Sequence, residues 1–132
     1  MTNSIINNIY YQIGDGSALY MLGTSKKNLG MEGDKSLIIK KIKNADRINK
    51  KKINMLKITL NANDLYDLDF YHLVNITEKN ILTYFDNNPL TLLSKINDIF
   101  LEDLKPIIQK TLGLDLGFLL IDKYVIKKIG EL

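Results

Sequence analysis

Two groups of side chains in this 132-residue chain have the types and spacing to support chemistry. The first group is acidic and comprises Asp64, Asp67 and Asp69. Metal-dependent nucleases and hydrolases need several carboxylates that converge on one or two cations. On a strand, Asp67 and Asp69 would share one face at a separation of roughly 6.5–7 Å.

Structural roles explain the same carboxylates. Asp64 can cap a turn, and the other two can line the solvent face of an amphipathic strand. No His, Glu or Lys lies at a spacing that would complete a catalytic site with these carboxylates. The sequence therefore predicts no catalytic residue, no metal site and no cofactor, and a small metal-dependent enzyme is the least favoured function.

The second group is basic and is concentrated in one part of the chain. Its members are Lys40, Lys41, Lys43, Arg47, Lys50, Lys51, Lys52 and Lys57. Clustered lysines neutralise phosphates and release counterions, which gives salt-dependent affinity with little sequence preference. The excess of Lys over Arg argues against bidentate base readout. A solvated loop would account for the same run, so nucleic-acid contact is one of two interpretations.

Several other chemistries are excluded by composition. The chain has no cysteine, which removes disulfides, thiolate metal sites and cysteine nucleophiles. His72 is the only histidine, and its strand face is shared with apolar residues, which indicates a structural role. Neither a phosphate-binding glycine motif nor a G-x-S-x-G elbow is present.

The charge is divided between the two parts of the chain. The first sixty residues hold eleven Lys and Arg against four Asp and Glu, and the rest hold seven against eleven. A bipolar chain of this kind can present one basic face. We expect a cytoplasmic protein, because no apolar run reaches the ~20 residues of a membrane span and the N-terminus lacks the basic region of a signal peptide.

The most strongly patterned stretch is Met55–Val74. A strand over Lys57–Leu60, a turn over Asn61–Asp64 and a strand over Leu65–Val74 form the predicted hairpin. Alternation directs Tyr66, Leu68 and Phe70 to the core and Asp67 and Asp69 to solvent. This hairpin is expected at the centre of the sheet.

The flanking segments supply the remaining elements. Helical spacing predicts a helix over 2–13 and another from about 98 to 112, in which Pro106 fits best in the first turn of a helix starting near 103. Apolar runs predict strands over 18–23, 36–42 and 81–85, whereas 23–34 and 44–54 are expected to be exposed loops. Two segments stay open: 90–94 as strand or helix, and 118–129 as a closing helix or a hairpin.

Together these elements predict an α+β fold in a single domain over 1–132. The expected architecture is an antiparallel sheet of four to five strands, one helix packed on a face of the sheet, and flanking terminal helices. The domain would comprise an N-terminal helix over 1–14, a core over 18–114 and a C-terminal extension over 117–132.

Four segments in this order resemble a family of small uncharacterised proteins of bacteriophages, prophages and plasmids. The first is Leu22-Gly23-Thr24-Ser25-Lys26-Lys27-Asn28, and the second is the strand beginning at Ser36. The third comprises Ile58-Thr59-Leu60, Asp64, Tyr66-Asp67 and Phe70, and the fourth is Thr111-Leu112-Gly113-Leu114. The resemblance covers about Ala18 to Leu114. The stretch 75–96 looks longer than the family's connection, and 117–132 has no counterpart.

The resemblance implies a mobile-element context in a bacterial host cell, and the family has no assigned activity. We therefore expect first a non-enzymatic protein that binds a host or phage protein, for example as an inhibitor of a host defence system. The alternative is a nucleic-acid-binding accessory protein that uses the basic run. The apolar segment Phe118–Ile129 would allow a homo-oligomer.

Overall fold

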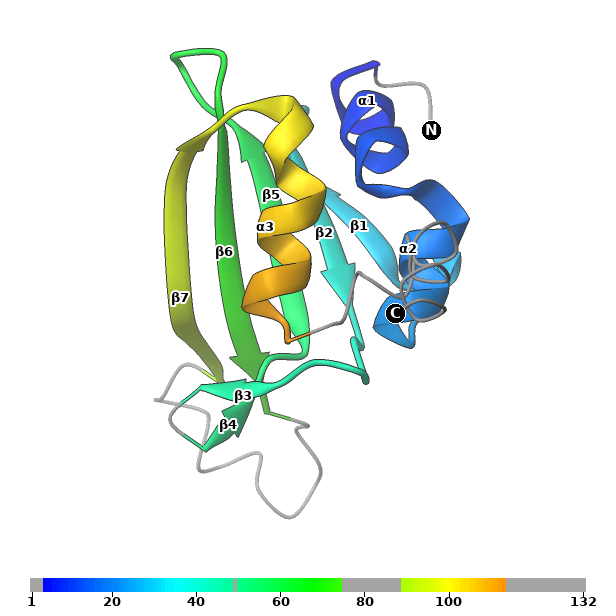
Figure 1. Cartoon of the computed structure of the whole chain (residues 1–132), viewed down its shortest axis with the longest axis vertical. Coiled ribbons are helices and arrows are strands. Elements are labelled where there is room, and N and C mark those ends of the chain that lie inside the picture. Colours follow the sequence, from blue (N-terminus) through cyan, green and yellow to red (C-terminus); the bar gives the residue numbers. More distant parts are fainter. Residues whose placement is uncertain (1–3, 49, 75–88, 114–132) are drawn as a thin grey trace, which may run out of the picture.

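The computed structural model describes residues 4–48, 50–74 and 89–113 (Figure 1). The helices are α1 (Ser4–Ile13), α2 (Asp15–Leu22) and α3 (Leu104–Thr111), with short 3₁₀ turns η1 (Lys26–Asn28) and η2 (Leu101–Asp103). The strands are β1 (Leu29–Glu32), β2 (Ser36–Lys40), β3 (Arg47–Ile48), β4 (Lys51–Lys52), β5 (Met55–Leu60), β6 (Tyr66–Leu73) and β7 (Leu90–Ile99). The α+β prediction is confirmed.

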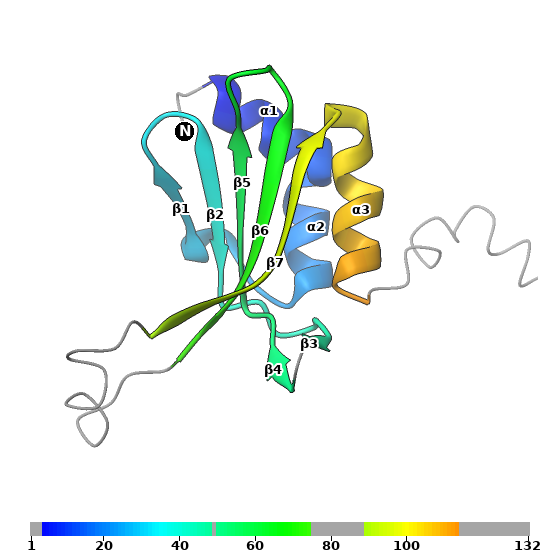
Figure 2. The same ribbon diagram turned by 90° about the vertical axis from the view of Figure 1, so that its left-hand side faces the viewer.

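Five strands form one antiparallel sheet in the order β1-β2-β5-β6-β7. The two-residue strands β3 and β4 pair only with each other and interrupt this meander between β2 and β5. In Figure 2 they lie beyond the end of the sheet at which β2 finishes. The sheet is thus built from neighbours in sequence, with one small hairpin projecting from one end of its inner strands β2 and β5.

The β5–β6 hairpin lies within the sheet, as the alternation predicts. Leu56 pairs with Phe70 and Ile58 with Leu68, and all four side chains are buried on one face. In the turn, the side-chain oxygen of Asn61 accepts the backbone N–H of Asn63 at 2.8 Å and of Leu65 at 3.2 Å. The Asn-rich turn chemistry therefore sets the register of the hairpin.

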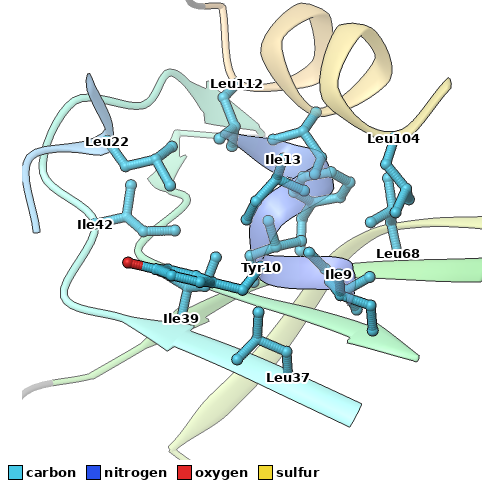
Figure 3. Packing of buried hydrophobic residues seen from close by; sticks show 14 of the residues in the cluster. Ile9, Tyr10, Ile13, Leu22, Leu37, Ile39, Ile42, Leu68, Leu104 and Leu112 are labelled. Carbon is cyan, nitrogen blue, oxygen red and sulfur yellow. The ribbon is translucent and has the colours of Figure 1, made fainter. Parts of the chain in front are cut away.

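All three helices pack on the same face of the sheet (Figures 1 and 2). Figure 3 shows Ile9 and Ile13 of α1 between Leu37 of β2 and Leu104 and Leu112 of the α3 region. The i, i+4 spacing puts these isoleucines on one stripe, which is buried. Among the described residues, the opposite face of the sheet carries no helix.

The predicted strand over 18–23 is wrong, because this segment is the second half of α2. Strand alternation would bury every second side chain, but Leu19 and Leu22 are buried whereas Tyr20 is 82% exposed. Gly23, at φ +77°, ends the helix with its N–H on the carbonyl of Tyr20. Ala, Leu and Met favour the helix, and Gly23 supplies the left-handed stop that glycine adopts without strain.

Three boundaries also differ from expectation. The predicted loop over 23–34 contains η1 and the edge strand β1, and the predicted loop over 44–54 contains β3 and β4. The open segment 90–94 is strand, and β7 extends to Ile99, so α3 begins only at Leu104. Pro106 then lies in the first turn of α3, where its missing N–H costs no helical hydrogen bond.

The expectations for 81–85 and for 118–129 lie outside the described residues, as does the C-terminal extension over 117–132. Within the part of the chain that the structure describes, no helix has the length and apolar character to cross a membrane.

Candidate nucleic-acid interface

The strand directions separate the charges of the described residues toward opposite ends of the sheet. At one end, Leu29 pairs with Ile39 and Lys40 with Met55, and the segments that leave the sheet there carry the basic residues. We call these residues the basic end: Lys26, Lys27, Lys40, Lys41, Lys43, Arg47, Lys50, Lys51 and Lys52. These segments contain one acidic residue, Asp46.

The opposite end of the sheet is acidic. There Glu32 pairs with Ser36 and Thr59 with Asp67. Further carboxylates are Asp34 and Asp64 in the adjoining turns, Asp98 near the end of β7, and Glu102 and Asp103 in η2. The uneven charge along the sequence therefore becomes an uneven charge across the fold. An anionic polymer would meet attraction at one end and repulsion at the other.

The β3–β4 hairpin carries the densest part of the basic end. Lys50 turns the chain at φ +70°, and its carbonyl accepts a hydrogen bond from Arg47 at 3.4 Å. The Nζ atom of Lys52 donates to the carbonyl of Lys43. The side chains of Lys50 and Lys51 remain exposed and have no ion-pair partner among the described residues.

His72 holds this hairpin against the sheet. Its Nδ1 lies 2.8 Å from the carbonyl oxygen of Lys52, and because that oxygen only accepts, Nδ1 is the donor. The backbone N–H of Ile53 donates to the carbonyl of Asp46 at 3.2 Å. The hydrogen bond to Lys52 gives His72 a structural role, because it holds a basic residue of the hairpin to β6.

A second part of the basic end surrounds a hollow. It is open to solvent, has a volume of about 390 Å³ and is lined by Gly23, Thr24, Ser25, Lys27, Asn28, Lys41 and Lys43. Two segments meet here because the backbone N–H groups of Lys43 and Asn44 both donate to the carbonyl of Leu22, at 2.9 and 3.0 Å. The segment after β2 thereby satisfies the exposed carbonyls at the C-terminus of α2.

The structure brings together most of the sequence-predicted basic residues and separates one of them. Lys57 lies in the middle of β5, on the sheet face that carries no described helix, where it forms an ion pair with Glu32. Lys57 is therefore not part of the basic end. Lys40, the last residue of β2, extends its side chain over β1, since a Cβ atom at Gly30 would lie 3.8 Å from the Nζ atom of Lys40.

The acidic residues Asp67 and Asp69 have structural partners. Asp67 accepts hydrogen bonds from the side chain of Asn61 and from the backbone N–H of Asp98, both at 3.0 Å, beside a register shift in β7. Asp69 is 7% exposed and pairs with Lys95 at 2.8 Å. The expectation that Asp69 faces solvent is wrong, because β7 and its lysine cover it.

The described residues contain no group of three or more His, Asp or Glu side chains that could hold a metal ion. Asp64 lies in the turn at φ +62°, a conformation that Asp tolerates better than most residues. The three carboxylates considered in the sequence therefore contribute to turn, bulge and ion-pair geometry.

Sequence reasoning missed the contribution of the segment that follows α2. Lys27 lies with Lys41 and Lys43 around the hollow, although sixteen positions separate Lys27 from Lys43. The glycine at 23 and the lysine pair that follows it were the local signal. Their partner segment could not be identified without the pairing of β1 with β2.

Alkaline pH is expected to destabilise the fold through Tyr66. Burial, and secondly the charge of Asp64, raise the pKa of this tyrosine above its ordinary value of 10.0. The pKa of Lys95 is also raised, chiefly by the hydrogen bond between Lys95 and Asp69. Both groups lose their proton at a lower pH in the unfolded chain than in the folded chain, so stability is fully present below pH 10.0 and falls as the pH rises through the native pKa values.

Urea unfolding on either side of pH 10.0 measures this effect. The Tyr66→Phe variant should lose less stability over that interval than the wild type, and Tyr20→Phe, at an exposed tyrosine, should behave as the wild type. Equal pH dependence in the wild type and in Tyr66→Phe would show that Tyr66 contributes nothing.

No family model, curated protein or solved structure matches this chain.

Proposed function

We propose that this protein is a non-enzymatic binding protein that contacts nucleic acid through its basic end. The observation that supports the proposal is the separation of charge across the fold. Lysines from η1, from the segment that follows β2 and from the β3–β4 hairpin extend from one end of the sheet, whereas the acidic residues lie at the other. A duplex or single strand presents the complementary charge, one negative charge per phosphate.

The chemistry of these side chains favours contacts with the backbone over base readout. Lysine acts as a compact point charge on a flexible stem, without the planar fork with which arginine recognises guanine. Arg47 is the arginine of the chain, and its guanidinium already donates to the carbonyl of Lys50. Binding should therefore depend strongly on salt and weakly on base sequence.

Fluorescence anisotropy with labelled oligonucleotides tests the proposal. If about five phosphates are neutralised on a duplex, the logarithm of the association constant should fall against the logarithm of salt concentration with a slope of about −4.5. Two oligonucleotides of different sequence should give similar affinities. Failure to bind single-stranded or double-stranded DNA or RNA at low salt would overturn the proposal.

A matched pair of charge reversals localises the interface. Lys51→Glu, on the exposed hairpin, and Lys35→Glu, at the acidic end, change the net charge equally. Lys51→Glu should weaken binding by about tenfold or more, since it removes one attraction and adds one repulsion. Lys35→Glu should change affinity little. Equal losses would indicate an effect of net charge alone.

A partner protein from a bacterial host or a phage remains the alternative proposal. The resemblance to phage, prophage and plasmid proteins supports it, and inhibition of a host defence system is one example of this function. Absence of nucleic-acid binding together with recovery of one specific bacterial protein, dependent on a defined surface, would favour this function.

A further inference from the structure

The hollow at the basic end differs from the rest of the basic surface because three lysines line one concavity. Lys27 belongs to η1, and Lys41 and Lys43 belong to the segment that follows β2. A volume of about 390 Å³ lies in the range of small-molecule sites. The hollow thus has room for a phosphate group and the sugar that carries it.

Its charge is unbalanced among the described residues. No Asp or Glu lines the hollow, and none of its three lysines forms an ion pair with another described residue. Lys41 adopts φ +58°, an uncommon conformation for a side chain of this size, at the point where the chain leaves β2. Three uncompensated cations around one concavity repel each other and favour an anion between them.

Neutral groups give the hollow a defined shape. The hydroxyl of Thr24 donates to the carbonyl of Lys40 at 2.7 Å and accepts from the side-chain amide of Asn28 at 3.0 Å. Thr24 therefore joins the two segments that line the hollow. Ser25 also lines it, and its hydroxyl makes no hydrogen bond to any other described residue, so it can donate to an anion.

Gly23 cannot be replaced without changing this wall. Gly23 has a φ of +77°, which other residues rarely adopt. In addition, a Cβ atom at this position would lie 2.9 Å from the side chain of Asn44 and 3.0 Å from that of Lys43. Both residues belong to the segment that meets the C-terminus of α2. The hollow therefore depends on close backbone approach at Gly23.

We propose that this hollow binds a terminal phosphate of a nucleic acid. A phosphomonoester carries about −1.5 to −2 charge at pH 7, whereas a backbone diester carries one. Three lysines around one concavity match the monoester better, and a chain end can enter a hollow without threading through it. The proposal rests on the proposed nucleic-acid function, with the hairpin contacting the backbone that follows the terminal phosphate.

The experiment compares two single strands of about 12 nucleotides, within the usual site sizes, that differ only in a 5′-phosphate or 5′-hydroxyl. A second pair differs at the 3′ end in the same way. Anisotropy should give at least a tenfold preference for one phosphorylated end. Lys27→Gln/Lys41→Gln/Lys43→Gln should reduce that preference to about twofold or less.

The control variant Arg47→Gln/Lys50→Gln/Lys51→Gln removes the same number of charges from the hairpin. It should weaken both oligonucleotides of a pair by a similar factor and keep the preference. Inorganic phosphate provides a direct probe, and NMR amide shifts should cluster at Gly23–Asn28 and Lys41–Lys43. Circular dichroism establishes that each variant is folded.

The outcomes separate this proposal from the proposed function. Salt-dependent binding with equal affinity for phosphorylated and hydroxyl ends would overturn the terminal-phosphate site and leave nucleic-acid binding intact. Phosphate-induced shifts at the hollow without oligonucleotide binding would retain an anion site and overturn the nucleic-acid function. Loss of the preference in the hairpin variant would overturn the assignment to the hollow.

Discussion

Replacing Phe70 by alanine is expected to lower the free energy of unfolding by about 3–5 kcal/mol. Phe70 is the largest of the fully buried side chains and lies on β6, between Leu56 of β5 and Ser94 of β7. Truncation removes its apolar contacts and leaves a cavity beneath the helices, where the sheet cannot collapse freely. Domains of this size are stable by roughly 5–15 kcal/mol, so a large part of the stability would be lost.

Chemical denaturation followed by circular dichroism measures the change. Phe70→Leu is the control, because leucine keeps an apolar side chain that fills more of the site than alanine does and should therefore cost clearly less than Phe70→Ala. It also keeps the prediction testable if Phe70→Ala does not fold. A cost below about 1 kcal/mol for Phe70→Ala would contradict the central position of this side chain.

Replacing Lys95 by methionine is expected to destabilise the protein more than any removal of Asp69. The side chain of Asp69 is 10% exposed, and that of Lys95 is 47% exposed. Without Lys95 a carboxylate stays buried with its main partner gone, whereas without Asp69 the ammonium can turn to solvent. Because Lys95 is half-exposed, solvent screening limits the expected cost of Lys95→Met to about 1–2 kcal/mol.

A double-mutant cycle checks the asymmetry. Asp69→Val should cost little, since valine suits a strand, and Asp69→Val/Lys95→Met should recover most of the loss caused by Lys95→Met. Chemical denaturation at neutral pH provides the four free energies. An additive double variant would show that the two side chains do not interact.

The sequence alone determined the elements whose side-chain period is strong. Alternation and the Asn-rich turn identified the β5–β6 hairpin and its core residues Leu68 and Phe70, because a strand with one buried face has only one register that buries its apolar side chains. The position of Pro106 identified the first turn of α3. The uneven charge along the chain also predicted one basic face.

Tertiary structure decided what these local signals could not. The segment 18–22 has too few residues for its period to separate helix from strand, and its packing against the sheet with Leu19 and Leu22 buried makes it helical. Asp69 is buried because β7 brings Lys95 opposite it. Alternation within β6 cannot predict which residue of another strand will lie beside Asp69.

The candidate site shows the same division. The sequence predicted a candidate binding surface at the lysines between 40 and 52, and it included Lys57 because proximity along the chain was the only available criterion. The register of β5 places Lys57 beside Glu32, away from the basic end. The pairing of β1 with β2 brings Lys27 to Lys41 and Lys43, so only the folded chain forms the hollow.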